Sequence, residues 1–207
     1  RSLTKDDEPE LRAFLERYAA LALPLLLTVE RGGIVCTGQS GQAHFLAVME
    51  RNLVRAVLAL GTDGLVMVLC PEPEDMPRLV DMWKDWFEGA AHGLLGPREQ
   101  VEELVDLLGG DNLSFRLNNT ELVNEVRLED LPEPPPHPQL DGRLAREADL
   151  ELLVSWRLAW LADVMHMPLT ETLAHHVTRD LRQAVAEQRV ALLEENGTPL
   201  AMGQCMM

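Results

Sequence analysis

The sequence has 207 residues, of which 46% are hydrophobic and 25% charged, so it can bury an ordinary core and is predicted to form one large domain or two small ones. Its net charge of -16 argues against non-specific nucleic-acid binding, which requires clustered Lys and Arg to neutralise phosphates. The longest apolar run, residues 18–29, contains Pro24 and is too short to span a bilayer, so no membrane role is predicted.

The first part of the chain predicts a helix followed by three short strands. Apolar residues recur at helical spacing between Glu8 and Leu27, which predicts one core-facing helix that ends before Gly32-Gly33. Three Val- and Leu-rich runs separated by turn residues are predicted to be strands: His44–Glu50, Leu53–Leu60 and Leu65–Cys70.

Strands and helices then alternate, which is typical of an α/β protein. Helical spacing resumes at Glu74–Phe87, and Gly109-Gly110 is a suitable stop for the helix that comes after. The remaining elements predicted for this part are a strand at Gly93–Pro97, a helix at Arg98–Leu108, and closing strands at Leu113–Leu117 and Glu121–Leu128.

A proline-rich segment, Pro132–Pro138, breaks all regular structure and is predicted to link two domains, residues 1–131 and 139–207. Asp149 and Thr170 are suitable N-caps for two helices in the second domain. Its predicted elements are a strand at Gly142–Glu147, helices at Asp149–Met165 and Thr170–Gln188, and a hairpin at Arg189–Met207 that turns at Asn196-Gly197.

The two parts of the chain share a short pattern. Leu46–Asn52 aligns with Val190–Asn196, and Ala56–Leu58 follows at the same offset as Leu200–Met202. The order of elements around both segments favours an internal repeat. Strand-turn-strand patterns also recur by chance, so the sequence leaves both interpretations open.

The second domain resembles the opening half of a GCN5-related N-acetyltransferase (GNAT). Members of that superfamily commonly begin Arg-x-Ala-x-x-x-Asp-Leu, which is present at Arg143–Leu150, and continue to a hairpin similar to Glu194–Ala201. The first domain, including Gly93–Val101, resembles the divergent N-terminal region of two-part bacterial members. The resemblance implies a mixed α/β, GNAT-like fold and transfer of an acetyl group from acetyl-CoA to a small-molecule or peptide amine.

One part of the family pattern is absent. In this family the next strand leads to a Gln/Arg-x-x-Gly-x-Gly/Ala loop that holds the coenzyme A pyrophosphate at a helix N-terminus. That loop is expected after Met207, so the chain is interpreted as truncated before it, and the similar Gly38–Ala43 is predicted to be an ordinary loop. Two functions stay open: part of an acetyltransferase, or a non-catalytic binding module with the same fold. The strand Pro199–Met207 is expected to pair with a further segment or with a second subunit.

Four residues are candidates for the acceptor site, because related enzymes line that site with the first helix and the loop after it. They are Trp156, Arg157, Trp160 and His166. Arg157 interrupts an apolar stripe, where an unpaired charge is costly. It is therefore predicted either to form a salt bridge or to recognise an anionic acceptor.

Candidates for other chemistry are few. Glu194 and Glu195 at the hairpin turn are the candidate general bases for deprotonating an amine. His176 and Asp180 lie one helical turn apart, but no third ligand is evident, and no metal is predicted. The three cysteines are far apart and lack a Cys-x-x-Cys pair, which favours a reducing cytoplasm.

Overall fold

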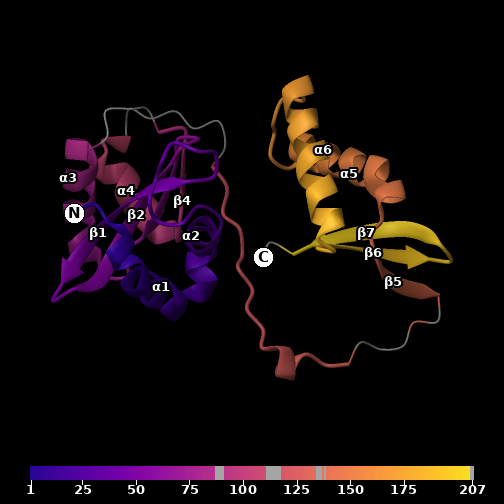
Figure 1. The fold of residues 1–207 in the computed structure, drawn as a ribbon, viewed down its shortest axis with the longest axis horizontal. Helices are drawn as coiled ribbons and strands as arrows, with labels where there is room; N and C mark the ends of the chain where they lie inside the picture. Colours follow the sequence, from indigo (N-terminus) through magenta and orange to yellow (C-terminus); the bar gives the residue numbers. More distant parts are fainter. Residues whose placement is uncertain (87–90, 111–117, 134–136, 138, 206–207) are drawn as a thin grey trace. The chain divides into compact units, whose positions relative to one another are not determined.

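The computed structural model describes residues 1–86, 91–110, 118–133, 137 and 139–205. The chain forms two compact units, Arg1–Val126 (unit 1) and Arg127–Met207 (unit 2), and each combines helices with a sheet (Figure 1). The fold class is therefore mixed α/β, as predicted. Among the described residues, none of the helices combines the length and apolar character needed to cross a membrane.

Unit 1 contains a four-stranded sheet with the order β1-β2-β3-β4. Neighbouring strands pair antiparallel, except that β3 and β4 are parallel. Its elements in chain order are the 3-10 helix η1 (Lys5–Asp7), α1 (Glu8–Arg17), α2 (Ala19–Gly32), β1 (Ala43–Glu50), β2 (Leu53–Gly61), β3 (Leu65–Leu69), the 3-10 helix η2 (Pro73–Asp75), α3 (Met76–Trp86), β4 (Gly93–Leu95) and α4 (Arg98–Leu107).

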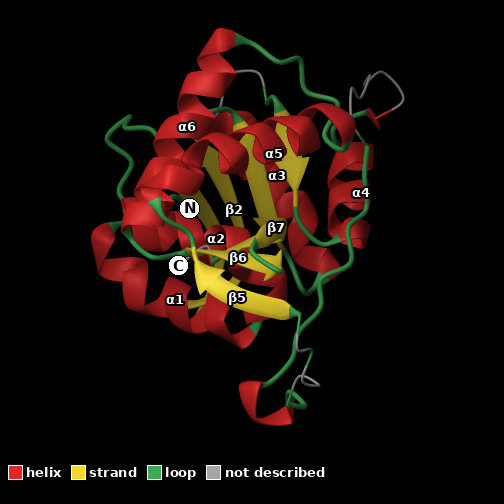
Figure 2. Cartoon of the chain, turned by 90° about the vertical axis from the view of Figure 1, so that its right-hand side faces the viewer, coloured by secondary structure: helices red, strands yellow, loops and turns green. Residues whose placement is uncertain are grey.

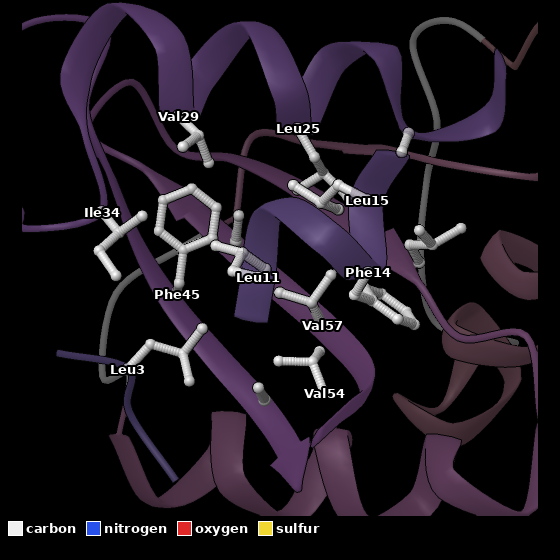
Figure 3. Packing of buried hydrophobic residues seen from close by; sticks show 14 of the residues in the cluster. Leu3, Leu11, Phe14, Leu15, Leu25, Val29, Ile34, Phe45, Val54 and Val57 are labelled. Atoms are coloured by element: carbon white, nitrogen blue, oxygen red, sulfur yellow. The ribbon is translucent and has the colours of Figure 1, made fainter. Parts of the chain in front are cut away.

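Helices cover both faces of this sheet. One core cluster joins α1 and α2 to Phe45, Ala47, Val57 and Ala59 (Figure 3). The other face packs against α3 and α4, and its strand residues include Leu46, Val48, Ala56 and Leu58. Because side chains alternate between faces along a strand, consecutive apolar residues in β1 and β2 serve both clusters.

The strands predicted in unit 1 are confirmed through β4, and so are the helices that come after β3 and β4. The single helix predicted from Glu8 to Leu27 is wrong. The chain breaks at Tyr18 (φ -118°, ψ 34°), α2 begins at Ala19, and Leu21 is exposed. A straight helix of 20 residues would extend about 30 Å, whereas two shorter helices keep both apolar stripes on one sheet face.

The closing strand predicted at Glu121–Leu128 is also wrong, because residues 121–127 have no regular structure. Leu122 and Val126 are exposed there. Apolar and polar residues alternate in this segment, but it does not pair with a strand in the described part of the chain. The strand predicted at Leu113–Leu117 lies outside the described residues.

Unit 2 has a three-stranded antiparallel sheet with the order β5-β6-β7. Both of its longer helices lie on one side of that sheet (Figures 1 and 2). The elements are the 3-10 helix η4 (Leu128–Asp130), β5 (Leu140–Leu144), the 3-10 helix η5 (Glu147–Asp149), α5 (Leu150–Asp163), α6 (Glu171–Ala186), β6 (Val190–Glu195) and β7 (Thr198–Gln204).

The helices and the hairpin predicted for unit 2 are confirmed, whereas two local predictions change. The first strand ends at Leu144 and not at Glu147, because a 3-10 turn intervenes. Asp149 does not cap α5 with its side chain. Thr170 does cap α6, since its hydroxyl accepts the backbone N–H of Leu173 at 3.1 Å.

Candidate functional site

An arginine ties the first strand of unit 2 to the helical turn after it. Arg143 donates to both carboxylate oxygens of Asp149, at 2.7 and 2.8 Å, and to Glu194 on β6 at 2.8 Å. The Asp149 carboxylate also accepts the backbone N–H of Arg146. The hydrogen bonds from Arg143 lower the pKa of Asp149 from 3.8 to about 2. The cluster thus fixes the entry into α5.

The same arrangement occurs at the beginning of unit 1. Arg1 donates to Asp7 at 2.9 Å, and the Asp7 carboxylate accepts the backbone N–H of Thr4 at 2.8 Å. The hydrogen bond from Arg1 holds the pKa of Asp7 well below its usual range. In both units the arginine stands six residues before the aspartate, and a 3-10 turn ends at the aspartate.

The two hairpins also correspond. Arg51 and Asn52 form the turn of the first, and Asn196 and Gly197 form the turn of the second, all with positive φ. Each hairpin has a register shift in its pairing, between Val48 and Met49 in unit 1 and between Leu193 and Glu194 in unit 2. Superposing the two hairpins by their turns and register shifts matches Arg51 with Asn196 and Val48 with Leu193. This match differs by one residue from the alignment based on sequence.

Helix residues that face the core match in the same way. The buried residues that correspond are Leu11 and Leu153 in the first helices, and Leu25 and Leu181, with Val29 and Val185, in the second helices. Unit 2 therefore repeats the first part of unit 1 in element order, turn geometry and core positions.

The repeat makes one difference between the units conspicuous. Leu15 is fully buried in unit 1, in the same core cluster as Ala59 on β2. The corresponding residues in unit 2 are Arg157 and Gln204, and the Arg157 guanidinium donates to the Gln204 side-chain oxygen at 2.7 Å. Unit 2 thus has a polar pair at a place where the same fold is satisfied by two apolar side chains.

Two of the predicted acceptor residues are in contact. The Arg157 guanidinium lies over the indole ring of Trp160, 5.6 Å from the ring centroid, and Trp160 is 42% exposed. Among the described residues Arg157 has no carboxylate partner, so the predicted salt bridge is not formed. Gln204 was not predicted from the sequence, because it is the pairing of β7 with β6 that brings it beside α5.

The other two acceptor candidates are not brought into these contacts. Trp156 is half-buried and packs against the core of unit 2. His166 is exposed in the loop after α5, with φ 50°, and the loop is closed by a hydrogen bond from Met167 N–H to the Leu161 carbonyl.

The two candidate bases differ in their surroundings. Glu194 is 13% exposed and is paired with Arg143, so its oxygens are already engaged. Glu195 is half-buried at the end of β6, next to the turn. Neither lies beside Arg157 in strand register, since Gln204 pairs with Val190 at the opposite end of β6.

Unit 2 also has an open hollow of ≈ 610 Å³ near the end of α6. Arg143, Arg146 and Gln188 are among its lining residues, and Arg157 is not. Within the described part of the chain, no group of three His, Cys, Asp or Glu side chains is placed to hold a metal ion. Asp180, one turn from His176, is paired with Arg179 at 3.2 Å.

In unit 1 the chain continues beyond its hairpin into a loop that precedes a helix. Strand β3 leads through residues 70–75, Cys-Pro-Glu-Pro-Glu-Asp, to the N-terminus of α3. The prolines have no N–H to donate, and the carboxylates repel an anion. Asp75 is buried and paired with Arg55 at 2.8 Å and Arg78 at 3.1 Å. This loop is therefore unsuited to pyrophosphate.

No family model matches the chain, and neither the curated proteins nor the solved structures contain a match to it.

Proposed function

We propose that unit 2 forms the acceptor side of an acetyl-CoA-dependent N-acetyltransferase. The observation that carries the proposal is the Arg157–Gln204 pair, which unit 1 lacks, set in the element order strand, two helices and hairpin. That order and the residues Arg143–Leu150 are those of the GNAT resemblance. In the reaction, a neutral amine attacks the thioester carbonyl, the C–N bond forms as the C–S bond breaks, and the amine proton passes to a base.

The acceptor is an amine that also carries a carboxylate. Arg157 is oriented by Gln204 and Trp160, and its other N–H groups have no partner in the described part of the chain, which leaves them for a planar anion. A guanidinium held by a carboxamide and an indole keeps its whole positive charge, because neither partner neutralises it. Trp160 supplies an exposed apolar surface beside the charge for the body of the acceptor.

Unit 1 supports this function without binding coenzyme A. Its equivalent of the acceptor pair is the apolar Leu15 and Ala59, and its loop at residues 70–75 is unsuited to phosphate. The alternative is that both units are non-catalytic binding modules. The loop at residues 70–75 supports this alternative for unit 1 only. The polar pair Arg157 and Gln204 favours an active role for unit 2.

Acceptor binding is tested by replacing the polar pair of unit 2 with the apolar residues that unit 1 has at the same positions. The double variant Arg157→Leu and Gln204→Ala replaces the polar pair by the pair that the repeat already accommodates, so it is expected to fold. Glutamate and its amide analogues are titrated while the indole NMR signals are followed. The wild type is expected to respond to glutamate, and the double variant at least tenfold more weakly. Equal responses would overturn the acceptor assignment.

Acetyl transfer is assayed on a form of the protein that carries a Gln/Arg-x-x-Gly-x-Gly/Ala loop, because the resemblance assigns binding of the coenzyme A pyrophosphate to that loop. Release of the coenzyme A thiol with carboxylate-bearing amines is the expected result. A protein that carries the Gly-rich loop and still shows neither thiol release nor thermal stabilisation by millimolar acetyl-CoA would leave the binding module as the function.

A further inference from the structure

The open hollow of unit 2, beside the end of α6, has an apolar floor. Its volume of ≈ 610 Å³ is within the usual range of small-molecule sites in proteins. The apolar lining residues include Ala145, Val185 and Ala186, and the first two belong to the core cluster of unit 2. The hollow therefore gives solvent access to one side of that core, where the apolar part of a ligand can pack.

The counterpart of this place in unit 1 is filled. Leu3 corresponds to Ala145, because the Leu3 N–H donates to the Phe45 carbonyl at 2.8 Å and the Ala145 N–H donates to the Val190 carbonyl at 2.9 Å. Leu3 is only 7% exposed and lies in one cluster with Phe45 and Ile34 (Figure 3). Ala145 and Val190 have much smaller side chains than Leu3 and Phe45. The fold thus accommodates large apolar side chains where unit 2 is open.

The connection after the second helix differs in the same sense. In unit 1 the chain continues from Gly33, at the end of α2, into a loop that places Ile34 in the core cluster. In unit 2, α6 ends at Ala186 and β6 begins at Val190, and the residues between them are all polar. Unit 2 therefore supplies no apolar side chain from this connection.

The rim of the hollow carries polar side chains that a ligand can reach. The Arg146 guanidinium forms no hydrogen bond or ion pair in the described part of the chain. Gln188 has φ 55°, a conformation that usually takes glycine, and the end of α2 has Gly33 with φ 65°. The acidic lining residue, Glu147, is paired with Arg182 at 3.1 Å. The unpaired charge at the rim is therefore positive.

We propose that this hollow binds a small carboxylic acid with a branched aliphatic or aromatic body. The body packs on Ala145 and Val185, in the place that large side chains fill in unit 1. The carboxylate accepts hydrogen bonds from Arg146 and Gln188 at the rim. Arg157 does not line the hollow, so this site is separate from the proposed acceptor site. The proposal depends on the comparison of the two units and not on acetyl transfer.

The test titrates isovalerate and phenylacetate into the whole chain while the methyl NMR signals of Val185 and Ala186 are followed. Both acids are expected to shift these signals, with millimolar dissociation constants because an open hollow covers only part of a ligand. Ala145→Leu places the side chain of Leu3 in the hollow and should weaken binding at least tenfold. The matched control, Ala148→Leu, adds the same side chain at an exposed alanine outside the lining and should bind as the wild type does.

A second variant tests the charge without filling the hollow. Arg146→Gln changes an exposed side chain, and it should weaken isovalerate at least fivefold while leaving the uncharged isovaleramide unchanged. Equal binding by wild type and Ala145→Leu, or equal weakening of the acid and its amide, would overturn the proposal. Loss of isovalerate binding in the Arg157→Leu and Gln204→Ala double variant would also overturn it, because the acid would then lie at Arg157. If the acceptor assignment alone fails, the signals of Val185 still respond to isovalerate.

Discussion

Replacing Asp149 by Asn isolates the charge of the Arg143–Asp149 pair, because an amide oxygen can still accept the Arg146 N–H. The folded pKa of about 2 lies below the ordinary value of 3.8, so the ionised form stabilises unit 2 above about pH 4, and this contribution is lost as pH falls towards 2. A shift of this size corresponds to roughly 2–3 kcal/mol. Screening at a carboxylate that is still 15% exposed reduces the expected cost to about 1–2 kcal/mol at pH 7.

The measurement is a series of urea titrations from pH 2 to pH 7, monitored by the indole NMR signals of Trp156 and Trp160, which report on unit 2. The difference in unfolding free energy between wild type and Asp149→Asn should be constant above about pH 5 and should be largely lost at about pH 2, where the folded carboxylate titrates. Asp141→Asn, at an exposed carboxylate on the same strand, serves as the control and should have little effect. A difference that persists unchanged at pH 2, or no difference at pH 7, would refute the reasoning.

Three further predictions concern backbone packing, helix capping and thiol reactivity. Gly96→Ala should destabilise unit 1 by about 1–3 kcal/mol in urea titrations, because the new Cβ would lie 2.6 Å from the Val68 carbonyl oxygen. Thr170→Ala should cost about 0.5–2 kcal/mol through loss of the α6 cap. Burial raises the pKa of Cys70 to about 12, so iodoacetamide at pH 8 should label the exposed Cys205 much faster than Cys70 by mass spectrometry.

Matched variants define failure for each of these. Gly142→Ala places its Cβ at least 4 Å from every neighbouring atom and should be nearly neutral, so an equal loss in both glycine variants would contradict the packing argument. Thr178→Ala removes only a bond to the preceding turn of α6 and should cost less than the cap variant. Labelling of all three cysteines at one rate in the folded protein would contradict the burial of Cys70.

Most of the fold could be predicted because it depends on local signals. Apolar runs bounded by turn residues located β1, β2 and β3, and Asn196-Gly197 located the second hairpin. The break at Tyr18 could not be found in this way. The buried positions Leu11, Leu15, Ala22 and their successors keep helical spacing across it, so periodicity continues while the chain changes direction.

Part of the candidate site could also be predicted. Arg157 was recognised because it interrupts an apolar stripe, whereas its partner Gln204 stands 47 residues later and depends on the register of β6 and β7. Leu122 and Val126 show the converse error, since alternation without a pairing strand leaves both exposed. Contacts that depend on register are thus the part of a site that periodicity does not supply.

The comparison between the units separates the features that the fold requires from those that it does not. Leu11 and Leu153 are both fully buried, and both units keep the arginine–aspartate pair at the helix entry, so these features serve the fold. A polar pair at the positions of two core residues has no such explanation, because unit 1 buries apolar side chains, Leu15 and Ala59, at the same positions. We therefore expect unit 2 to act at Arg157, where an oriented guanidinium stands in place of an apolar core residue.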